Sequence, residues 1–240
     1  MLLLRRGGKF SDRQISKYLL KSLLCFGIAV FALVAVRYVK LPYVGLIVVA
    51  LAIPTFKANV RRWSNWYVGK RGEVLVAEAL KSLPNEYVLL NDLVLPEGGG
   101  NVDHLVIGPN GLFVIETKNY SGSVKCQGDI WCVNGRKVRS LSKQAKRNAI
   151  AIKRSLEAVF TEHRTRVPFV NALLVFANSG VKLNLIEPTV PVLRASELPR
   201  YLAEYHEAGT RQPALPEVSR AIVHHLLLLQ PKPDQLIANQ

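Results

Sequence analysis

Residues 101–119 read NVDHLVIGPNGLFVIETKN, and this stretch decides the fold of the chain. Two apolar runs, residues 101–107 and 112–118, flank the sequence Gly-Pro-Asn-Gly at 108–111. Proline and glycine in this arrangement are a strong turn signal, so the stretch predicts a β-hairpin. Both faces of the hairpin are apolar near the turn, and we therefore expect it to lie inside a sheet.

The open end of this hairpin carries charged residues. A turn centred between Pro109 and Asn110 places Asp103 opposite Glu116, and strand alternation puts Lys118 on the same face. Two facing carboxylates repel each other, and a divalent cation between them would remove that repulsion. Oxygen ligands at this density suit Mg²⁺ or Mn²⁺, and the lysine would help deprotonate a metal-bound water or stabilise charge on a phosphate. The alternative is a salt-bridged cluster at a sheet edge.

From residue 73 onward, the sequence predicts both helices and strands. A helix is expected at the start of this region, and apolar runs bounded by turn residues predict further strands. The expected helices are residues 73–83, 142–160, 196–207 and 216–229. The expected strands besides the hairpin are residues 86–95, 123–133 with a turn inside, 168–176 and 190–194. This order predicts the α/β fold class, with a mixed central sheet flanked by helices.

Several short motifs in this region resemble one known family. They are Gly72-Glu73 at the expected helix start, the stretch 101–104, the run from Gly108 to Asn119, and Ser121-Gly122. Over roughly residues 69–179 the chain resembles the nuclease-related domain (NERD) family of the PD-(D/E)xK nuclease superfamily. The resemblance implies a restriction-endonuclease-like fold and Mg²⁺-dependent cleavage of phosphodiester bonds.

The resemblance also implies roles for individual residues. Asp103 and Glu116 match metal ligands, Lys118 matches the catalytic lysine, and Glu73 matches a helix glutamate that completes the metal site. Gln144 resembles a glutamine that the family places on the following helix. Each of these two residues also has a purely structural interpretation. Glu73 would be a glutamate favoured by the dipole at a helix start, and Gln144 would be an ordinary surface residue. His104 points to the opposite strand face, where we expect it to pack in the core.

Composition and charge narrow the class of protein. The 240 residues include 32 Lys and Arg against 17 Asp and Glu, and 49% are apolar, which excludes a disordered chain. Three cysteines in 240 residues exclude a disulfide scaffold. None has C-x-x-C spacing, so no zinc-ribbon or redox motif is present, and a reducing compartment is favoured. Residues 1–72 hold 13 Lys and Arg and one acid, so most of the excess charge lies outside the expected α/β domain.

The N-terminal region contains two uncharged apolar segments, residues 22–36 and 41–56. Together they predict a transmembrane helical hairpin over residues 18–58, with a tight turn near Arg37 and Lys40. Basic residues are denser on the two flanks than at the turn, which places both termini in the cytoplasm. The alternatives are a cleaved signal peptide or a buried hairpin of a soluble protein; the first leaves the second segment unexplained, and the second lacks the usual polar helix face.

A second basic region lies within the expected domain, at residues 136–154, and it contains no acid. Contact with phosphates is the functional interpretation, and a solvated helix face or one near anionic lipid is the structural one. No base-reading motif such as a zinc finger is present, so sequence-specific recognition is not predicted.

Together these observations predict a membrane-anchored nuclease of the bacterial-type inner membrane, with its soluble domain in the cytoplasm. Mg²⁺ or Mn²⁺ is the expected cofactor and nucleic acid, first of all DNA, the expected partner; a homo-oligomer is left open. The rival hypotheses are a catalytically inactive tethered module that binds nucleic acid or protein, and a membrane scaffold. The predicted division is a basic cytoplasmic N-terminus (1–17), the transmembrane hairpin (18–58), a basic aromatic linker (59–68), the nuclease-related domain (69–179) and a C-terminal extension completing the α/β domain (180–240).

Overall fold

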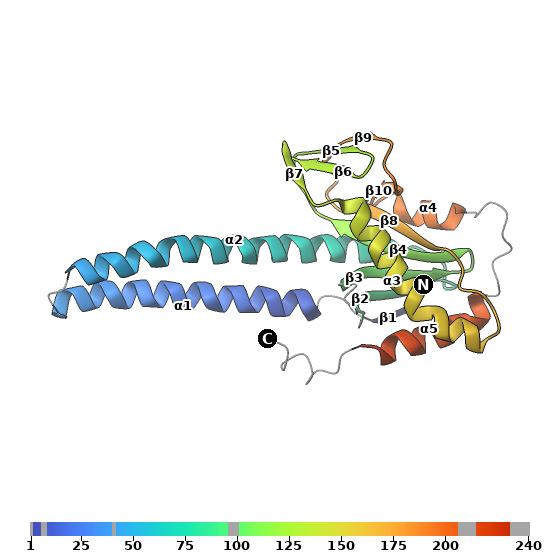
Figure 1. Cartoon of the computed structure of the whole chain (residues 1–240), viewed down its shortest axis with the longest axis horizontal. Coiled ribbons are helices and arrows are strands. Elements are labelled where there is room, and N and C mark those ends of the chain that lie inside the picture. The colour runs from blue at the N-terminus through green and yellow to red at the C-terminus, as the bar shows by residue number, and fades with distance from the viewer. Residues whose placement is uncertain (1, 6–8, 40–41, 96–100, 206–214, 231–240) are drawn as a thin grey trace. The chain divides into compact units, whose positions relative to one another are not determined.

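The computed structural model describes residues 2–5, 9–39, 42–95, 101–205 and 215–230 (Figure 1). The chain forms two compact units, which are described separately. The helical unit comprises residues 8–71, and the α/β unit comprises residues 1–7 together with 72–240. Helix α2 (Pro42–Leu80) contributes to both, because the boundary falls between Arg71 and Gly72.

The helical unit is an antiparallel hairpin of α1 (Lys9–Val39) and the first part of α2 (Figure 1). The rings of Phe26 and Phe56 lie with centroids 6.5 Å apart between the helices. Asp12 and Lys70 form an ion pair nearer the open end of the hairpin. Contacts between residues this far apart in sequence show that the two helices run side by side in opposite directions, as the predicted hairpin requires.

The outer surface of this hairpin is apolar. Exposed leucine, isoleucine, valine and phenylalanine side chains follow α1 from Leu19 to Val34 and α2 from Leu46 to Phe56. By length and composition, Asp12–Val36 of α1 is long and apolar enough to cross a membrane, the one such helix in the described part of the chain. Membrane anchors and N-terminal signal sequences both have such a helix, so membrane anchoring stays a prediction. The second span also stays a prediction, because the helix in α1 is the one that meets this criterion in the described residues.

The segment between the apolar part of α2 and the α/β unit differs from the prediction. We predict a linker at residues 59–68 and a helix starting near Gly72, whereas α2 is helical from Pro42 to Leu80. The basic and aromatic residues of this segment support a helix, because side chains one turn apart contact each other. Trp63 and Tyr67, for example, stack with ring centroids 5.8 Å apart. Polar composition alone does not make a loop.

The α/β unit is built on a six-stranded sheet. Its order is β1 (Leu2–Arg5), β2 (Val88–Val94), β3 (Asn101–Gly108), β4 (Gly111–Lys118), β8 (Val170–Phe176) and β10 (Val192–Arg194). Strands β2, β3 and β4 are antiparallel, whereas β1, β8 and β10 join parallel to their neighbours. The sheet is mixed, as predicted. Strand β1 was not predicted, and it lies in the basic N-terminus.

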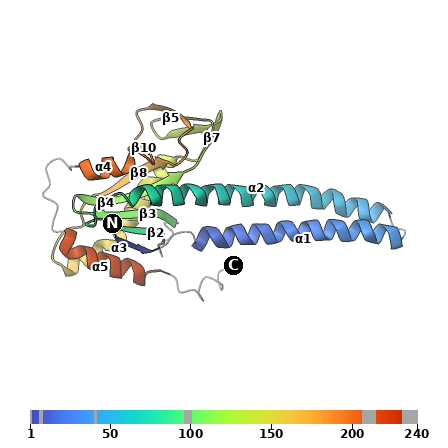
Figure 2. The same ribbon diagram turned by 180° about the vertical axis from the view of Figure 1, so that it is seen from behind.

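Helices cover both faces of this sheet, and the fold class is therefore confirmed. Leu105 and Val114 pack with Ile152 of α3 (Leu141–Glu162) and Ile222 of α5 (Leu215–Leu228). On the other face, the end of α2 and α4 (Leu198–Glu204) pack against the sheet, with Leu202 in the same cluster. Figures 1 and 2 show α4 and α5 on opposite sides of the sheet.

A second, four-stranded sheet is attached to this core. Its order is β7 (Arg136–Val138), β6 (Ile130–Val133), β5 (Ser123–Gln127) and β9 (Lys182–Ile186). The predicted strand-turn-strand at 123–133 is formed by β5 and β6, whereas β9 was not predicted. Trp131 of β6 is fully buried and packs near Phe176 of β8. Residues after 180 thus supply strands to both sheets.

Candidate active site

The predicted hairpin forms, and its regular pairing ends one residue before the predicted carboxylate pair. The paired residues run from Gly108 and Gly111 to His104 and Ile115, in the predicted register. At the next position, Oδ2 of Asp103 accepts a hydrogen bond from the backbone N–H of Thr117 at 2.7 Å. The Asp103 carboxylate is therefore held at the point where β3 and β4 separate.

Glu116 is the buried carboxylate of the site, with 1% of its surface exposed. Its Oε1 accepts a hydrogen bond from Nζ of Lys118 at 2.6 Å. Its Oε2 accepts one from Nδ2 of Asn148 at 3.0 Å. A buried carboxylate is costly unless it is paired and hydrogen-bonded, and here each oxygen has a donor.

Lys118 connects the hairpin to helix α3. Besides Glu116, its Nζ donates a hydrogen bond to Oε1 of Gln144 at 3.3 Å. Burial alone would lower the pKa of Lys118, but the carboxylates of Glu116 and Asp103 raise it above its ordinary value. The ammonium group is therefore charged at neutral pH. Its hydrogen bond to Gln144 brings this predicted residue into the site.

The site concentrates negative charge around Asp103. Burial raises the pKa of Asp103 well above its ordinary value, and the charges of Glu116 and Glu73 raise it further, whereas Lys118 and the Thr117 N–H oppose the shift. Glu73 thus lies close enough to act on Asp103. It also lies far inside α2, which begins at Pro42, so the alternative of a glutamate at a helix start is wrong.

His104 lies in the core, as expected. It is buried, and its Nδ1 lies 2.7 Å from Oδ1 of Asn91. Burial lowers the pKa of His104 to about 3, so the ring is neutral at physiological pH. Its Nε2 has no hydrogen-bond partner.

Three polar residues of the site were not predicted. Asn148 is 1% exposed, and besides Glu116 its Nδ2 contacts the backbone oxygen of Asn101 at 3.4 Å. The side-chain Nδ2 of Asn101 donates to Oδ1 of Asp92 at 2.7 Å. Asp92 is buried and has a positive φ of 56°, which is uncommon for a residue other than glycine. The available signal for Asn148 was its position one helical turn after Gln144.

The donor set of the site is suited to a hard divalent cation. Besides the carboxylates, the carbonyl oxygens Oδ1 of Asn101 and Oδ1 of Asn148 are buried and have no hydrogen-bond partner. Mg²⁺ and Mn²⁺ prefer such oxygen ligands. Across the described residues, however, no group of three or more His, Cys, Asp and Glu is placed to hold a metal ion. The predicted metal ligands Asp103, Glu116 and Glu73 therefore remain a prediction.

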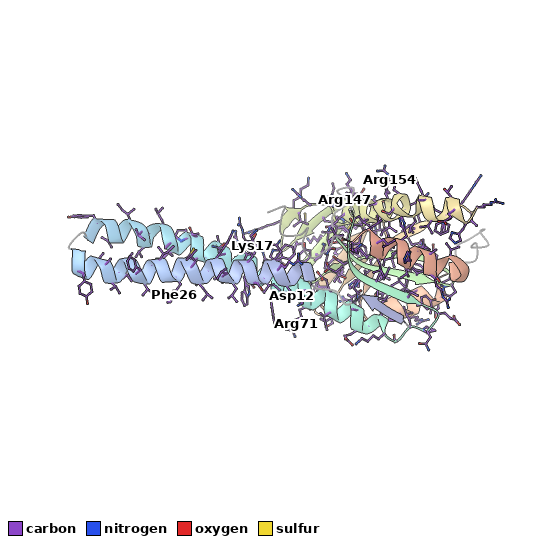
Figure 3. The ribbon with its side chains drawn as sticks, turned by 90° about the horizontal axis from the view of Figure 1, so that it is seen from below. Asp12, Lys17, Phe26, Arg71, Arg147 and Arg154 are labelled. Atoms are coloured by element: carbon purple, nitrogen blue, oxygen red, sulfur yellow. The ribbon has the colours of Figure 1, made fainter. Side chains whose placement is uncertain are left out.

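The predicted basic region divides into two surfaces. Lys143, Arg147 and Arg154 are exposed on α3, and Figure 3 shows Arg147 and Arg154 on the side of the helix that faces away from the sheet. Lys146 instead donates to both oxygens of Asp129 at 3.1 Å and to Thr189. Part of the basic run thus holds the second sheet, and part is available to an anionic partner.

Fold and site together describe an α/β domain of the kind expected for a nuclease superfamily, with an Asp…Glu-x-Lys arrangement where two central strands part. Residues 68–177 match the family model of the nuclease-related domain (NERD), so this part of the chain is a nuclease-related domain. An uncharacterized protein of Bacillus anthracis is 43% identical over 84 residues, which cover 32% of this chain and 38% of that protein. The chain thus spans well under half of the length of this curated relative. No solved structure matches the chain.

Proposed function

We propose that the chain is a membrane-anchored, metal-dependent nuclease that hydrolyses phosphodiester bonds of nucleic acid on the cytoplasmic side. One observation carries this proposal. In a domain that matches the nuclease-related family, Asp103, Glu116, Lys118 and Gln144 come together from β3, β4 and α3 where the strands separate. Charged groups concentrated in this way are typical of catalytic sites.

Each site residue has a proposed role. Asp103 and Glu116, with Glu73 from α2, would hold Mg²⁺ or Mn²⁺ through carboxylate oxygens. When bound, such a metal supplies a water of lowered pKa and Lewis-acid polarisation of the phosphate. Lys118 remains protonated, and its ammonium neutralises charge on the phosphate and orients the attacking water by hydrogen bonding. Gln144 holds the Lys118 ammonium by accepting its hydrogen bond.

The exposed basic residues of α3 support nucleic acid as the substrate. Lys143 and Arg147 lie within one helical turn of Gln144 along α3, so a nucleic acid bound to the outer side of this helix would run past the turn that carries Gln144. Contacts of this type bind the backbone and carry no sequence information. DNA is the substrate that we propose first.

The apolar surface of the helical unit supports membrane anchoring. The exposed apolar side chains of α1 and α2 would be unfavourable in water over so long a hairpin, whereas lipid would solvate them. Basic residues are concentrated where the chain enters and leaves the predicted hairpin, among them Lys17, Lys21, Arg61 and Arg62. Their density on this side favours termini in the cytoplasm. We propose two spans with this orientation.

One observation favours a second candidate, a tethered binding module without catalysis. Lys118 neutralises Glu116, so the cluster is also consistent with a salt-bridged group that requires no metal. Such a module would bind nucleic acid through α3 and leave it intact.

The deciding experiment is a cleavage assay with the full chain in detergent micelles. Linear and supercoiled DNA and an RNA of mixed sequence are incubated with Mg²⁺, Mn²⁺ or EDTA. We expect metal-dependent cleavage that falls by roughly 100-fold or more in Lys118→Ala, the range for loss of one transition-state donor. Lys81→Ala is the matched control, because Lys81 pairs with Glu78 on the exposed surface of α2. Nucleic-acid binding by the folded wild type with no cleavage in either metal would instead establish the binding module.

A further inference from the structure

The side-chain amide of Asn148 is buried and donates directly to a proposed metal ligand. It lies on the inner side of α3, and its Nδ2 reaches Oε2 of Glu116 at 3.0 Å. The opposite oxygen, Oε1, receives Lys118. The Glu116 carboxylate is therefore held from both sides, by an ammonium group on its own strand and by an amide on the helix.

The environment of Asn148 argues for a role beyond packing. Besides Gln144 one turn earlier, its neighbours on this side of α3 include the buried apolar residues Ala145, Ala149 and Ile152. An apolar residue of similar size would leave Oε2 of the buried Glu116 without the donor that it has from Asn148. The amide thus satisfies the carboxylate, although its own Oδ1 is buried without a hydrogen-bond partner.

We infer that Asn148 is a positioning residue, which fixes the rotamer of the Glu116 carboxylate so that Oε1 is presented to the metal. In the structure Lys118 donates to Oε1 of Glu116. A cation held by Oε1 would replace that donor, and Asn148 would keep the carboxylate oriented through Oε2. Donors behind a ligating carboxylate act in this way, and their loss typically weakens metal binding by 10- to 100-fold.

This inference rests on the proposed metal-dependent function, and metal binding tests it without an activity assay. Mn²⁺ affinity of the full chain in detergent is measured by calorimetry for the wild type, Asn148→Ala and Asn148→Leu. Alanine removes the donor and leaves a small cavity, whereas leucine removes the donor at nearly constant volume. We expect both variants to bind Mn²⁺ about 10- to 100-fold more weakly than the wild type.

Ser142→Ala is the matched control. Ser142 lies on the same helix and is equally buried, but its Oγ accepts a hydrogen bond from Nε1 of Trp131 at 2.6 Å, in the second sheet. Its removal should lower the thermal midpoint and leave Mn²⁺ affinity within about twofold, because it does not touch the site. The control separates general destabilisation from loss of carboxylate positioning.

The outcomes distinguish this inference from the proposed function. Wild-type binding with unchanged affinity in folded Asn148→Leu would overturn the role of Asn148 and leave the metal site standing. Equal weakening in Ser142→Ala would also overturn it, because the effect would then be general. Absence of Mn²⁺ binding to the folded wild type at millimolar concentration would overturn the metal-dependent function itself, and the role of Asn148 with it.

Discussion

The Asp103 carboxylate accepts a hydrogen bond from the backbone N–H of Thr117, at the point where regular pairing of β3 with β4 ends. An acidic side chain thus takes a position that a backbone carbonyl would take in an uninterrupted ladder. The end of the regular pairing lies beside Glu116 and Lys118 of β4. The three charged side chains of the site therefore gather where the β3–β4 ladder stops.

The raised pKa of Asp103 predicts that its carboxylate lowers stability when no metal is bound. Burial first, and then the charges of Glu116 and Glu73, raise this pKa in the folded state, so ionisation destabilises the fold as the pH rises above the ordinary value of 3.8. In EDTA near pH 7, Asp103→Asn should therefore raise the thermal midpoint, by about 2–4 °C for each kcal/mol of ionisation cost removed. Added Mn²⁺ should stabilise the wild type and leave the variant unchanged. Scanning calorimetry measures both, and a variant melting lower than the wild type in EDTA would contradict the expected cost of ionising Asp103.

His104 predicts a second pH dependence. Its pKa is lowered to about 3, so the neutral ring is favoured in the fold, and stability is lost as the pH falls below the ordinary value of 6.5. NMR of ring carbon-bound protons in protein labelled at histidine should show the neutral form of His104 at pH 5. Assignment comes from His104→Gln, which keeps a polar group near Asn91. A ring that titrates near 6.5 would mean that water reaches His104.

The exposed arginines of α3 predict salt-dependent nucleic-acid binding. Each phosphate contact contributes about −0.9 to the slope of log affinity against log salt concentration for duplex DNA. Arg147→Ala with Arg154→Ala should reduce the slope by up to about 1.8 and weaken binding at low salt. Fluorescence anisotropy with a labelled duplex measures the slope. Lys146→Ala is the control, because Lys146 is paired with Asp129; if it lowers the slope as much as the double variant, the outer side of α3 is not the binding surface.

The two-span arrangement predicts the accessibility of single cysteines in intact bacterial cells. In a variant whose three native cysteines are replaced by serine, Tyr43→Cys lies at the turn of the hairpin and Lys81→Cys just beyond α2. A membrane-impermeant maleimide should label Tyr43→Cys from outside and label Lys81→Cys only after lysis. Labelling of Lys81→Cys in intact cells would mean either that the orientation is the reverse of the one proposed or that the chain crosses the membrane once. Protection of both would argue against a turn outside the membrane.

The hairpin with its three charged residues could be predicted because the information is local. Alternation along a strand and the chemistry of a four-residue turn set the register of β3 against β4, and hence the positions of Asp103 and Glu116. The mixed fold followed from the order of apolar patterns. The apolar hairpin near the N-terminus followed from length and composition, which are also local properties.

Other features depended on residues far apart in the chain. Strand β1 pairs with β2 across more than 80 residues of sequence, and nothing in Leu2–Arg5 itself marks it as an edge strand. Asn148 became a site residue only when α3 packed against the sheet and brought it to Glu116. The continuity of α2 through its basic aromatic segment also depended on contacts that polar composition does not reveal.

The sequence by itself thus determined which strand residues could carry charge and on which face they would lie, because backbone geometry repeats every two residues. Only the tertiary structure decided which helix donors hold those charges, and that the regular pairing of β3 with β4 ends beside Asp103. These depend on the packing of separate elements, because the distance between two side chains in space is not encoded in their separation along the chain.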